Sequence, residues 1–379
     1  MSTDTTTTPA GSLPGTAAGT AAAGTAGGAP AEGTPTAAPA GTAAEAATRL
    51  AGVETLTIAK AINRALADEL AADEKVLLMG EDIGSLGGVY RVTEGLKARF
   101  GADRVVDSPL AESGIIGTSI GLALRGYRPV AEIQFDGFVF PGFNQITTQL
   151  AKMRARTRGA ASVPVTIRIP YGGGIGSIEH HSESPEALFT HTAGLRVITP
   201  SNAHDAYWMT RQAVRSQDPV IIFEPKRRYW LKGEVDLSEA GHRGLSAFEA
   251  QVVREGTDVT IAAWGPLVPV ALAAANAAAE DGRSVEVVDL RSLSPVDFDA
   301  LQASVEKTGR MVITHEAPTF GGLGGEIAAR LMERSFLHLE APILRVGGFH
   351  LPYPPSRVEE QYLPDLDRLL DAVDRTFAY

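Results

Sequence analysis

The sequence predicts an α/β protein with two doubly wound domains that follow a disordered amino-terminal tail. From Thr55 onward, short apolar runs alternate with stretches of helical periodicity, and a polar stretch at about 226–250 divides this alternation in two. Alternation of this kind is typical of parallel sheets covered by helices on both faces. We therefore expect one domain at 53–225, a linker at 226–250 and a second domain at 251–379.

The first 52 residues differ from the rest in composition. Residues 1–52 consist mainly of Ala, Thr, Gly and Pro, and few of them carry large apolar side chains. Such a segment cannot bury enough apolar surface to offset the entropy of its chain, so we expect a disordered tail. A flexible tether or a partner-binding arm is the functional alternative.

The first domain is expected to begin with an amphipathic helix. Thr57 is placed to cap it. Four apolar residues then recur at the spacing of one helical face: Ile58, Ile62, Leu66 and Leu70. Five later apolar runs are expected to be buried strands: Val76–Met79, Val130–Phe135, Val163–Ile169, Leu195–Thr199 and Val220–Phe223. Helices are expected to begin near Gly114, Phe143, Pro185 and Ala203.

The second domain repeats this pattern. Its expected strands are Val259–Trp264, Val285–Leu290, Met311–His315 and Ile343–Val346. Its expected helices are Pro266–Ala279, Gly325–Met332 and Leu366–Phe377. Parallel-sheet domains bind ligands at the carboxyl ends of their strands and at domain or subunit boundaries, so we expect the functional site there.

The composition excludes several classes of function. The 379 residues include no cysteine, which removes disulfides, thiolate nucleophiles and thiolate metal sites. The formal charge of −11 argues against a broad nucleic-acid surface, because phosphate contacts need clustered cations. No apolar run approaches the ~20 residues of a membrane-spanning helix. We therefore expect a cytoplasmic protein without nucleic-acid or membrane partners.

Two glycine-rich runs invite a nucleotide-binding interpretation. The Gly322–Gly324 run leads into an expected helix, but Ile327 stands where the third glycine of a dinucleotide fingerprint would be. The run Tyr171–Gly176 also fails that spacing. Both are better explained as tight turns with close backbone packing.

The adjacent pair His180-His181 lies in a long loop that follows an expected buried strand. A zinc site is disfavoured, because neighbouring residues on an extended chain point in opposite directions. Acid–base chemistry is one interpretation, since catalytic groups collect in loops at strand ends. A loop histidine bonded to Glu179 or Glu183 is the other, and the residues alone favour neither.

Two further features frame a possible site. Glu112 stands at the turn into an apolar helix, where chemistry alone favours an exposed anion stabilised by the helix dipole over a partly buried carboxyl group. The segment Glu132–Phe143 carries four aromatic residues near the end of an expected strand. Such a cluster is core by default, although it could also form a flat wall for a planar heterocycle.

These features stand in an order that resembles a known family. From Leu56 to Tyr379 the chain resembles the β subunit of the thiamine-diphosphate-dependent 2-oxo acid dehydrogenase first component, the group that contains the pyruvate and branched-chain enzymes. The motifs that carry the resemblance are Met79–Ile83, Gly87–Val92, Pro109–Gly117, Ala131–Pro141, Arg168–Gly172, His181-Ser182 and Phe223–Pro225. The resemblance implies a thiamine-pyrimidine-binding first domain and a transketolase-like carboxyl-terminal domain.

The resemblance also implies roles for single residues. Glu112 matches the family's cofactor glutamate, which hydrogen-bonds the aminopyrimidine ring of thiamine diphosphate, and this replaces the exposed-anion interpretation. Phe138 matches the aromatic residue that packs on that ring, and Gln134 and Leu110 fall at positions that line the same pocket. His181 matches an active-site histidine that assists proton transfer when the acyl group passes to lipoamide.

The resemblance further implies other ligands and partners. Five residues resemble a loop that binds a monovalent cation such as K⁺, largely through backbone carbonyls: Val165, Ala213, Val214, Ser216 and Asp218. Relatives anchor the diphosphate and its Mg²⁺ with a Gly-Asp-Gly motif, which does not occur in this sequence. A separate α subunit is therefore expected to hold the diphosphate and most of the Mg²⁺ contacts, in a heterotetramer of two α and two β chains. A lipoyl acyltransferase core would dock on the carboxyl-terminal domain.

The expected substrate is a 2-oxo acid. The segments Glu132–Phe135 and Ser182–Ala187 look closer to the branched-chain enzymes, so a branched-chain substrate is favoured and pyruvate is possible. Two alternatives remain: another enzyme of the transketolase superfamily, or a non-catalytic interaction subunit with the same fold.

Overall fold

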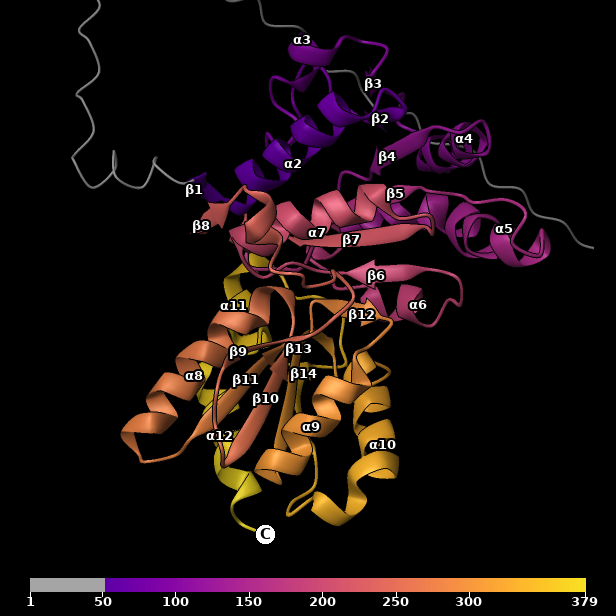
Figure 1. The fold of residues 1–379 in the computed structure, drawn as a ribbon. Helices are drawn as coiled ribbons and strands as arrows, with labels where there is room; N and C mark the ends of the chain where they lie inside the picture. Colours follow the sequence, from indigo (N-terminus) through magenta and orange to yellow (C-terminus); the bar gives the residue numbers. More distant parts are fainter. Residues whose placement is uncertain (1–51) are drawn as a thin grey trace, which may run out of the picture.

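Two α/β units make up the computed structural model, which describes residues 52–379 (Figure 1). The first is built on a seven-stranded sheet, with the spatial order β12 (Ser292–Ser294), β6 (Arg196–Ile198), β7 (Val220–Pro225), β5 (Thr166–Tyr171), β4 (Arg128–Glu132), β2 (Val76–Gly80) and β3 (Val105–Asp107). The second is built on a five-stranded sheet, with the order β14 (Leu344–Gly348), β13 (Met311–Pro318), β10 (Val259–Ala263), β11 (Val285–Asp289) and β9 (Gln251–Arg254). The predicted fold class is confirmed. The predicted tail, apart from Gly52, lies outside the described residues.

Helices cover both faces of the first sheet. They are α2 (Ile58–Ala72), α3 (Leu96–Phe100), α4 (Glu112–Leu124), α5 (Ala151–Arg156), α6 (Glu186–Thr190) and α7 (Ala203–Arg215). The expected cap of α2 is present, because the Thr57 hydroxyl accepts a hydrogen bond of 3.2 Å from the backbone N–H of Lys60. A 3₁₀ segment, η2 (Asp136–Gly142), and a π-helical turn, η3 (Gln145–Leu150), stand where a single helix near Phe143 was expected.

Parallel pairing and burial on two faces explain why the first sheet is so apolar. β2 pairs in parallel with β3 and β4, and all five of its residues are buried. Val76 and Leu78 belong to the apolar cluster formed with α2 and α7, whereas Leu77 and Met79 belong to the cluster formed with α4. This alternation is the period of two expected of a strand between two helical layers.

The segment expected to be a linker contains regular structure. β8 (Lys232–Asp236) pairs antiparallel with β1 (Val53–Thr57) in a two-stranded sheet. Only Val235 of β8 is fully buried. A strand with a single buried side chain leaves almost no apolar signal in the sequence, which explains why we did not expect it.

The second unit has helices α8 (Val268–Glu280), α9 (Phe298–Thr308), α10 (Leu323–Ser335), α11 (Glu359–Tyr362) and α12 (Leu366–Thr376). Of these, α9 and α11 were not expected. β12 belongs to this half of the sequence, yet it pairs antiparallel with β6 and extends the first sheet. Arg291, just before β12, forms a buried ion pair of 3.0 Å with Asp205 of α7. The two units are therefore joined by a shared sheet edge and a buried ion pair.

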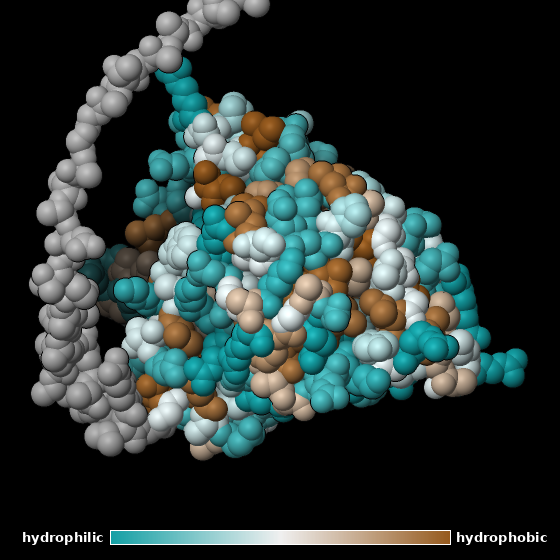
Figure 2. Space-filling model, turned by 90° about the horizontal axis from the view of Figure 1, so that it is seen from above, coloured by the Kyte–Doolittle hydropathy of each residue, from teal (hydrophilic) through white to brown (hydrophobic). Residues whose placement is uncertain are grey.

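The surface agrees with the mixed composition. In the view from above in Figure 2, apolar residues form small separate groups among hydrophilic ones. Between residues 52 and 379, no helix has the length and apolar character needed to cross a membrane.

Candidate active site

The predicted site residues gather at the carboxyl ends of neighbouring parallel strands. Glu112 begins α4, which follows β3, and η2 with Phe138 follows β4. The long loop with His181 follows β5. Helix α4 packs against η2, and η2 packs against the short 3₁₀ turn η4 (Glu179–His181). The sheet therefore brings three separate chain segments to one place, as expected for this fold.

Glu112 is buried, contrary to the exposed anion that chemistry alone favoured. Its residue surface is 8% exposed, although it lies in the first turn of α4. Gly142 lets η2 approach the start of α4 closely, since a Cβ atom there would lie only 3.3 Å from the backbone carbonyl oxygen of Glu112. Among residues 52–379, no hydrogen-bond donor reaches the Glu112 carboxylate. The carboxylate oxygens are not among the fully enclosed polar atoms of residues 52–379, so a ligand that brings its own N–H group can reach this unpaired acceptor.

Phe138 and His181 meet at the surface of an aromatic cluster. Their ring centroids are 5.2 Å apart, and the Phe135 ring lies 4.2 Å from the His181 ring. Gly137 permits this approach, because a Cβ atom there would overlap the backbone of His180. Phe138 is only partly buried, so its ring is available to pack against a planar ligand.

The histidine pair divides into two environments. The His180 side chain is 45% exposed, and its Nδ1 atom lies 3.8 Å from a carboxylate oxygen of Glu179. His181 contacts the aromatic cluster instead, and its Nδ1 atom is buried without a hydrogen-bond partner. Burial, together with the nearby His180 and Lys226, lowers the pKa of His181 below its usual 6.5. Within the described chain, no group of three or more His, Asp or Glu side chains could hold a metal ion.

A buried ion pair supports this arrangement, and we did not expect it from the sequence. Lys226 and Asp136 are both fully buried and form an ion pair. Asp136 also accepts a hydrogen bond of 2.8 Å from the backbone N–H of Glu183, two residues after His181. Burial raises the pKa of Asp136 to about 6, even though Lys226 opposes this shift. The pair was missed because Asp136 lies within an aromatic run and Lys226 lies in the expected linker.

A second buried network lies in the neighbouring strands. Arg168 of β5 donates to Glu224 of β7 at 2.7 Å and 2.9 Å, and to Glu132 of β4 at 2.5 Å. The Tyr229 hydroxyl donates to Glu224 at 2.6 Å. Burial raises the pKa of Glu132, and the nearby carboxylate of Glu224 adds to this shift, although Arg168 opposes it. This network links β4 and β5, whose ends carry Phe138 and His181, to the neighbouring strand β7.

The two remaining pocket residues are more exposed. Leu110 is 71% exposed, and Gln134 is partly buried at the end of β4. Leu110 lies two residues before Glu112, the first residue of α4.

The expected cation loop lies at the opposite, amino-terminal edge of the sheet. Arg128 donates to the carbonyl oxygens of Val214 and Ser216 at 3.2 Å and 3.1 Å. The Ser216 hydroxyl donates to the carbonyl of Asp218, whose carboxylate pairs with Arg196 at 3.0 Å. In this structure, hydrogen bonds from Arg128 and Ser216 therefore already reach three of the backbone oxygens of this loop. The cation ligands, with Val165 and Ala213, stay a prediction.

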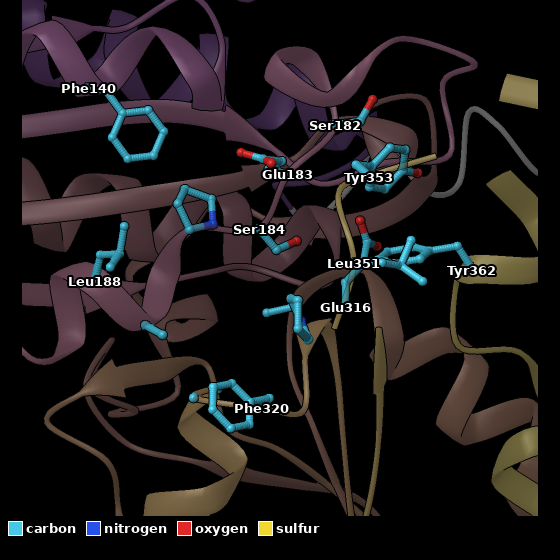
Figure 3. A pocket seen from close by; sticks show the side chains of 16 residues that line it. Phe140, Ser182, Glu183, Ser184, Leu188, Glu316, Phe320, Leu351, Tyr353 and Tyr362 are labelled. Carbon is cyan, nitrogen blue, oxygen red and sulfur yellow. The ribbon is translucent and has the colours of Figure 1, made fainter. Parts of the chain in front are cut away.

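A cavity of about 220 Å³ lies between the two units, beside the His181 loop (Figure 3). The first unit contributes the segment Ser182–Pro185 and Phe140, while the second contributes Glu316, Phe320 and Tyr353. The second unit therefore reaches the segment that carries His181, although it contributes none of the predicted site residues.

Comparison with known proteins agrees with this architecture. Residues 54–230 match the family described as "Transketolase, pyrimidine binding domain", and residues 249–369 match "Transketolase, C-terminal domain". A solved structure described as "Split gene transketolase, inactive beta4 tetramer" has a TM-score of 0.69 and 23% identity, and covers 85% of this chain and 98% of that chain. This likeness shows the fold.

Two curated relatives are much closer in sequence. The "Pyruvate dehydrogenase E1 component subunit beta" of Leifsonia xyli is 61% identical over 327 residues, which are 86% of this chain and 96% of the relative. The "3-methyl-2-oxobutanoate dehydrogenase subunit beta" of Mycobacterium tuberculosis is 54% identical over 327 residues, which are 85% of this chain and 92% of the relative. With both domains matched and nearly the full length of these relatives covered, the chain belongs to the β-subunit family of the 2-oxo acid dehydrogenase E1 components.

Proposed function

We propose that this chain is the β subunit of a 2-oxo acid dehydrogenase complex and takes part in thiamine-diphosphate-dependent oxidative decarboxylation of a 2-oxo acid. The observation that carries this proposal concerns Glu112, a buried residue whose carboxylate has no hydrogen-bond donor among the described residues. Glu112 begins the helix that packs against the Phe138 segment. A branched-chain 2-oxo acid is the favoured substrate, with pyruvate second.

The chain's own residues suit the pyrimidine half of the cofactor. Glu112 would accept a hydrogen bond from the aminopyrimidine ring, and Phe138 would pack against the flat face of that ring. Gln134 and Leu110 would line the same pocket. When bound, thiamine diphosphate supplies the carbanion that attacks the 2-oxo carbon.

His181 is suited to moving a proton near neutral pH. Its lowered pKa keeps the imidazole neutral at pH 7, so the ring can accept a proton. Because Nδ1 is buried, Nε2 is the nitrogen that would face a substrate. We propose that this group assists acyl transfer to the lipoyl acceptor.

The site is proposed to be shared with an α subunit. The sequence has no Gly-Asp-Gly motif, so the α subunit would hold the diphosphate and the Mg²⁺ ion. Two α and two β chains would form the active heterotetramer, which would in turn bind a lipoyl acyltransferase core.

Co-expression with a candidate α subunit tests this proposal. Decarboxylation would be measured on pyruvate and on 3-methyl-2-oxobutanoate, with and without thiamine diphosphate and Mg²⁺. We expect activity only in the co-purified complex and only with the cofactor, and the faster substrate identifies the preferred acid. Turnover by the purified chain alone would contradict a shared site.

A further inference from the structure

The glycine run in the His181 loop has a structural purpose that the proposed chemistry does not explain. Gly172, Gly174 and Gly176 have φ angles of +83°, +78° and +72°, a region that favours glycine. A positive φ at every second residue turns successive backbone N–H groups toward one side, and these groups form an anion-binding concavity. The sequence alone suggested only tight turns here.

Carboxylates of the second unit fill this concavity. The Gly174 N–H donates to Oε1 of Glu359 at 2.8 Å, and the Gly176 N–H donates to Oε2 of the same residue at 3.0 Å. The Gly173 N–H donates to Oε1 of Glu316. Three loop N–H groups are thus held by two acidic side chains, so this concavity is not free for a phosphate.

Both carboxylates are themselves fixed by their surroundings. Glu316, near the end of β13, is 3% exposed, and Glu359, the first residue of α11, is 6% exposed. The Tyr353 hydroxyl donates to Oε1 of Glu359 at 2.6 Å and accepts from the Gly174 N–H at 3.3 Å. A Cβ atom at Gly173 would overlap Tyr353, so close packing also depends on glycine there.

The first unit holds the same loop at its base. The Gly172 N–H donates to the carbonyl of Glu183 at 2.9 Å, which closes the loop, and the Glu183 N–H is bound by Asp136. His181 lies between this base and the glycine run. Figure 3 shows Glu316 and Tyr353 of the second unit beside the segment from Ser182 to Ser184.

We propose that Glu359 is a positioning residue, through which the carboxyl-terminal domain orders the active-site loop and holds His181 against Phe138. Glu359 contacts no predicted cofactor residue, and it acts only through the backbone of the loop. The effect on catalysis rests on the proposed function, whereas the effect on loop order does not.

Hydrogen exchange on the full chain tests loop order without any assay of activity. Glu359→Gln keeps the size of the side chain but replaces one acceptor oxygen with an N–H₂ group that faces a backbone N–H. We expect amide exchange in residues 173–178 to become about tenfold faster or more, because a hydrogen bond to a charged group is lost. The adjacent, exposed Glu360 provides the matched control, and Glu360→Gln should leave exchange unchanged. Equal exchange in the two variants would overturn the proposal.

Tyr353→Phe is a milder second variant. It removes the hydroxyl that bridges Glu359 and Gly174 but keeps the ring that packs on Tyr362, with centroids 5.1 Å apart. We expect faster exchange in the same amides, by a smaller factor than in Glu359→Gln. No change in these amides would contradict the role given to this carboxylate, even if Glu359→Gln failed to fold.

The assembled complex with the α subunit tests the catalytic consequence. In Glu359→Gln we expect acyl transfer to a lipoyl acceptor to slow about tenfold or more, while the Kd for thiamine diphosphate stays within about twofold, because Glu112 and Phe138 lie outside the loop. The acid limb of the pH–rate profile should move toward the ordinary histidine value, because His181 loses its fixed contacts.

The outcomes separate the two proposals. An unchanged rate and profile, despite faster exchange, would overturn the positioning role. An inactive wild-type complex would contradict the proposed function instead, and the exchange experiment would still decide whether Glu359 orders the loop.

Discussion

The rings of Phe138 and His181 lie 5.2 Å apart, centre to centre, at an interplanar angle of 74°. One ring comes from the segment after β4 and the other from the loop after β5, so the contact requires that the two strands are parallel neighbours. It places a planar packing surface beside a titratable imidazole.

Replacing His181 should impair acyl transfer more than decarboxylation. In the assembled complex, His181→Gln is expected to slow transfer to a lipoyl acceptor by about 10²-fold or more, the usual contribution of a positioned acid–base group. Decarboxylation with an artificial electron acceptor should change much less. The exposed His191 serves as the control, and His191→Gln should behave as wild type.

The pH dependence provides a second test of His181. Its pKa is lowered by burial and by nearby positive charge, so the neutral ring persists below pH 6.5. Activity should therefore fall as the pH drops through a value under 6.5, where the ring becomes protonated. An acid limb centred above 6.5, or one that persists in His181→Gln, would contradict this assignment.

Phe138 should contribute to cofactor affinity through its ring. Phe138→Ala is expected to weaken thiamine diphosphate binding about tenfold, while Phe138→Tyr should stay close to wild type because the ring is kept. Titration calorimetry on the complex measures both affinities. Phe320→Ala, which removes an aromatic side chain that is 73% exposed, should have no effect on binding. Equal affinities in Phe138→Ala and wild type would show that the ring does not contact the cofactor.

The buried network around Arg168 should be important for stability. Arg168→Met leaves Glu132 and Glu224 buried without their cation, so the free energy of unfolding should fall by about 3–5 kcal/mol. Urea denaturation measures this difference. Arg357 is exposed, and Arg357→Met should change stability by less than about 0.5 kcal/mol. A loss below about 1 kcal/mol in Arg168→Met would show that the network is not tightly coupled.

Glu186 should make stability depend on pH. Its side chain is buried beside Trp264, and burial raises its pKa from 4.5 to about 8. Between these values the folded state binds more protons than the unfolded state, so wild-type stability falls as pH rises through this window. Glu186→Gln removes the proton uptake, so its stability relative to wild type should be higher at pH 8 than at pH 5. If the difference in stability between Glu186→Gln and wild type were the same at both pH values, this result would contradict the raised pKa of Glu186.

Much of the architecture could be predicted because its signals are strong. Buried parallel strands are short apolar runs, and β2, β7, β10 and β11 lie within a residue or two of the expected ranges. β8 and β12 were missed because one has a single fully buried side chain and the other is only three residues long. Short or half-exposed strands have too little periodicity to be recognised.

The candidate site was predicted in part, because the resemblance identifies the site residues but not the residues that hold them in place. Glu112, Phe138 and His181 belong to recognisable motifs. Glu359 lies 178 residues after His181, and its contacts are to backbone N–H groups, which leave no trace in the identity of a partner side chain. Contacts of this kind depend on how two domains pack, and local sequence patterns do not contain that information.

The most direct test of the whole account is the decarboxylation rate of Glu112→Gln in the assembled complex, with cofactor affinity measured separately. Gln keeps the shape of the side chain but replaces the carboxylate, so we expect kcat to fall by about 10²-fold or more while the complex still assembles and binds thiamine diphosphate. Glu74→Gln, at an exposed position, should leave kcat unchanged. Near-normal decarboxylation by Glu112→Gln would contradict the central claim that the Glu112 carboxylate activates the cofactor.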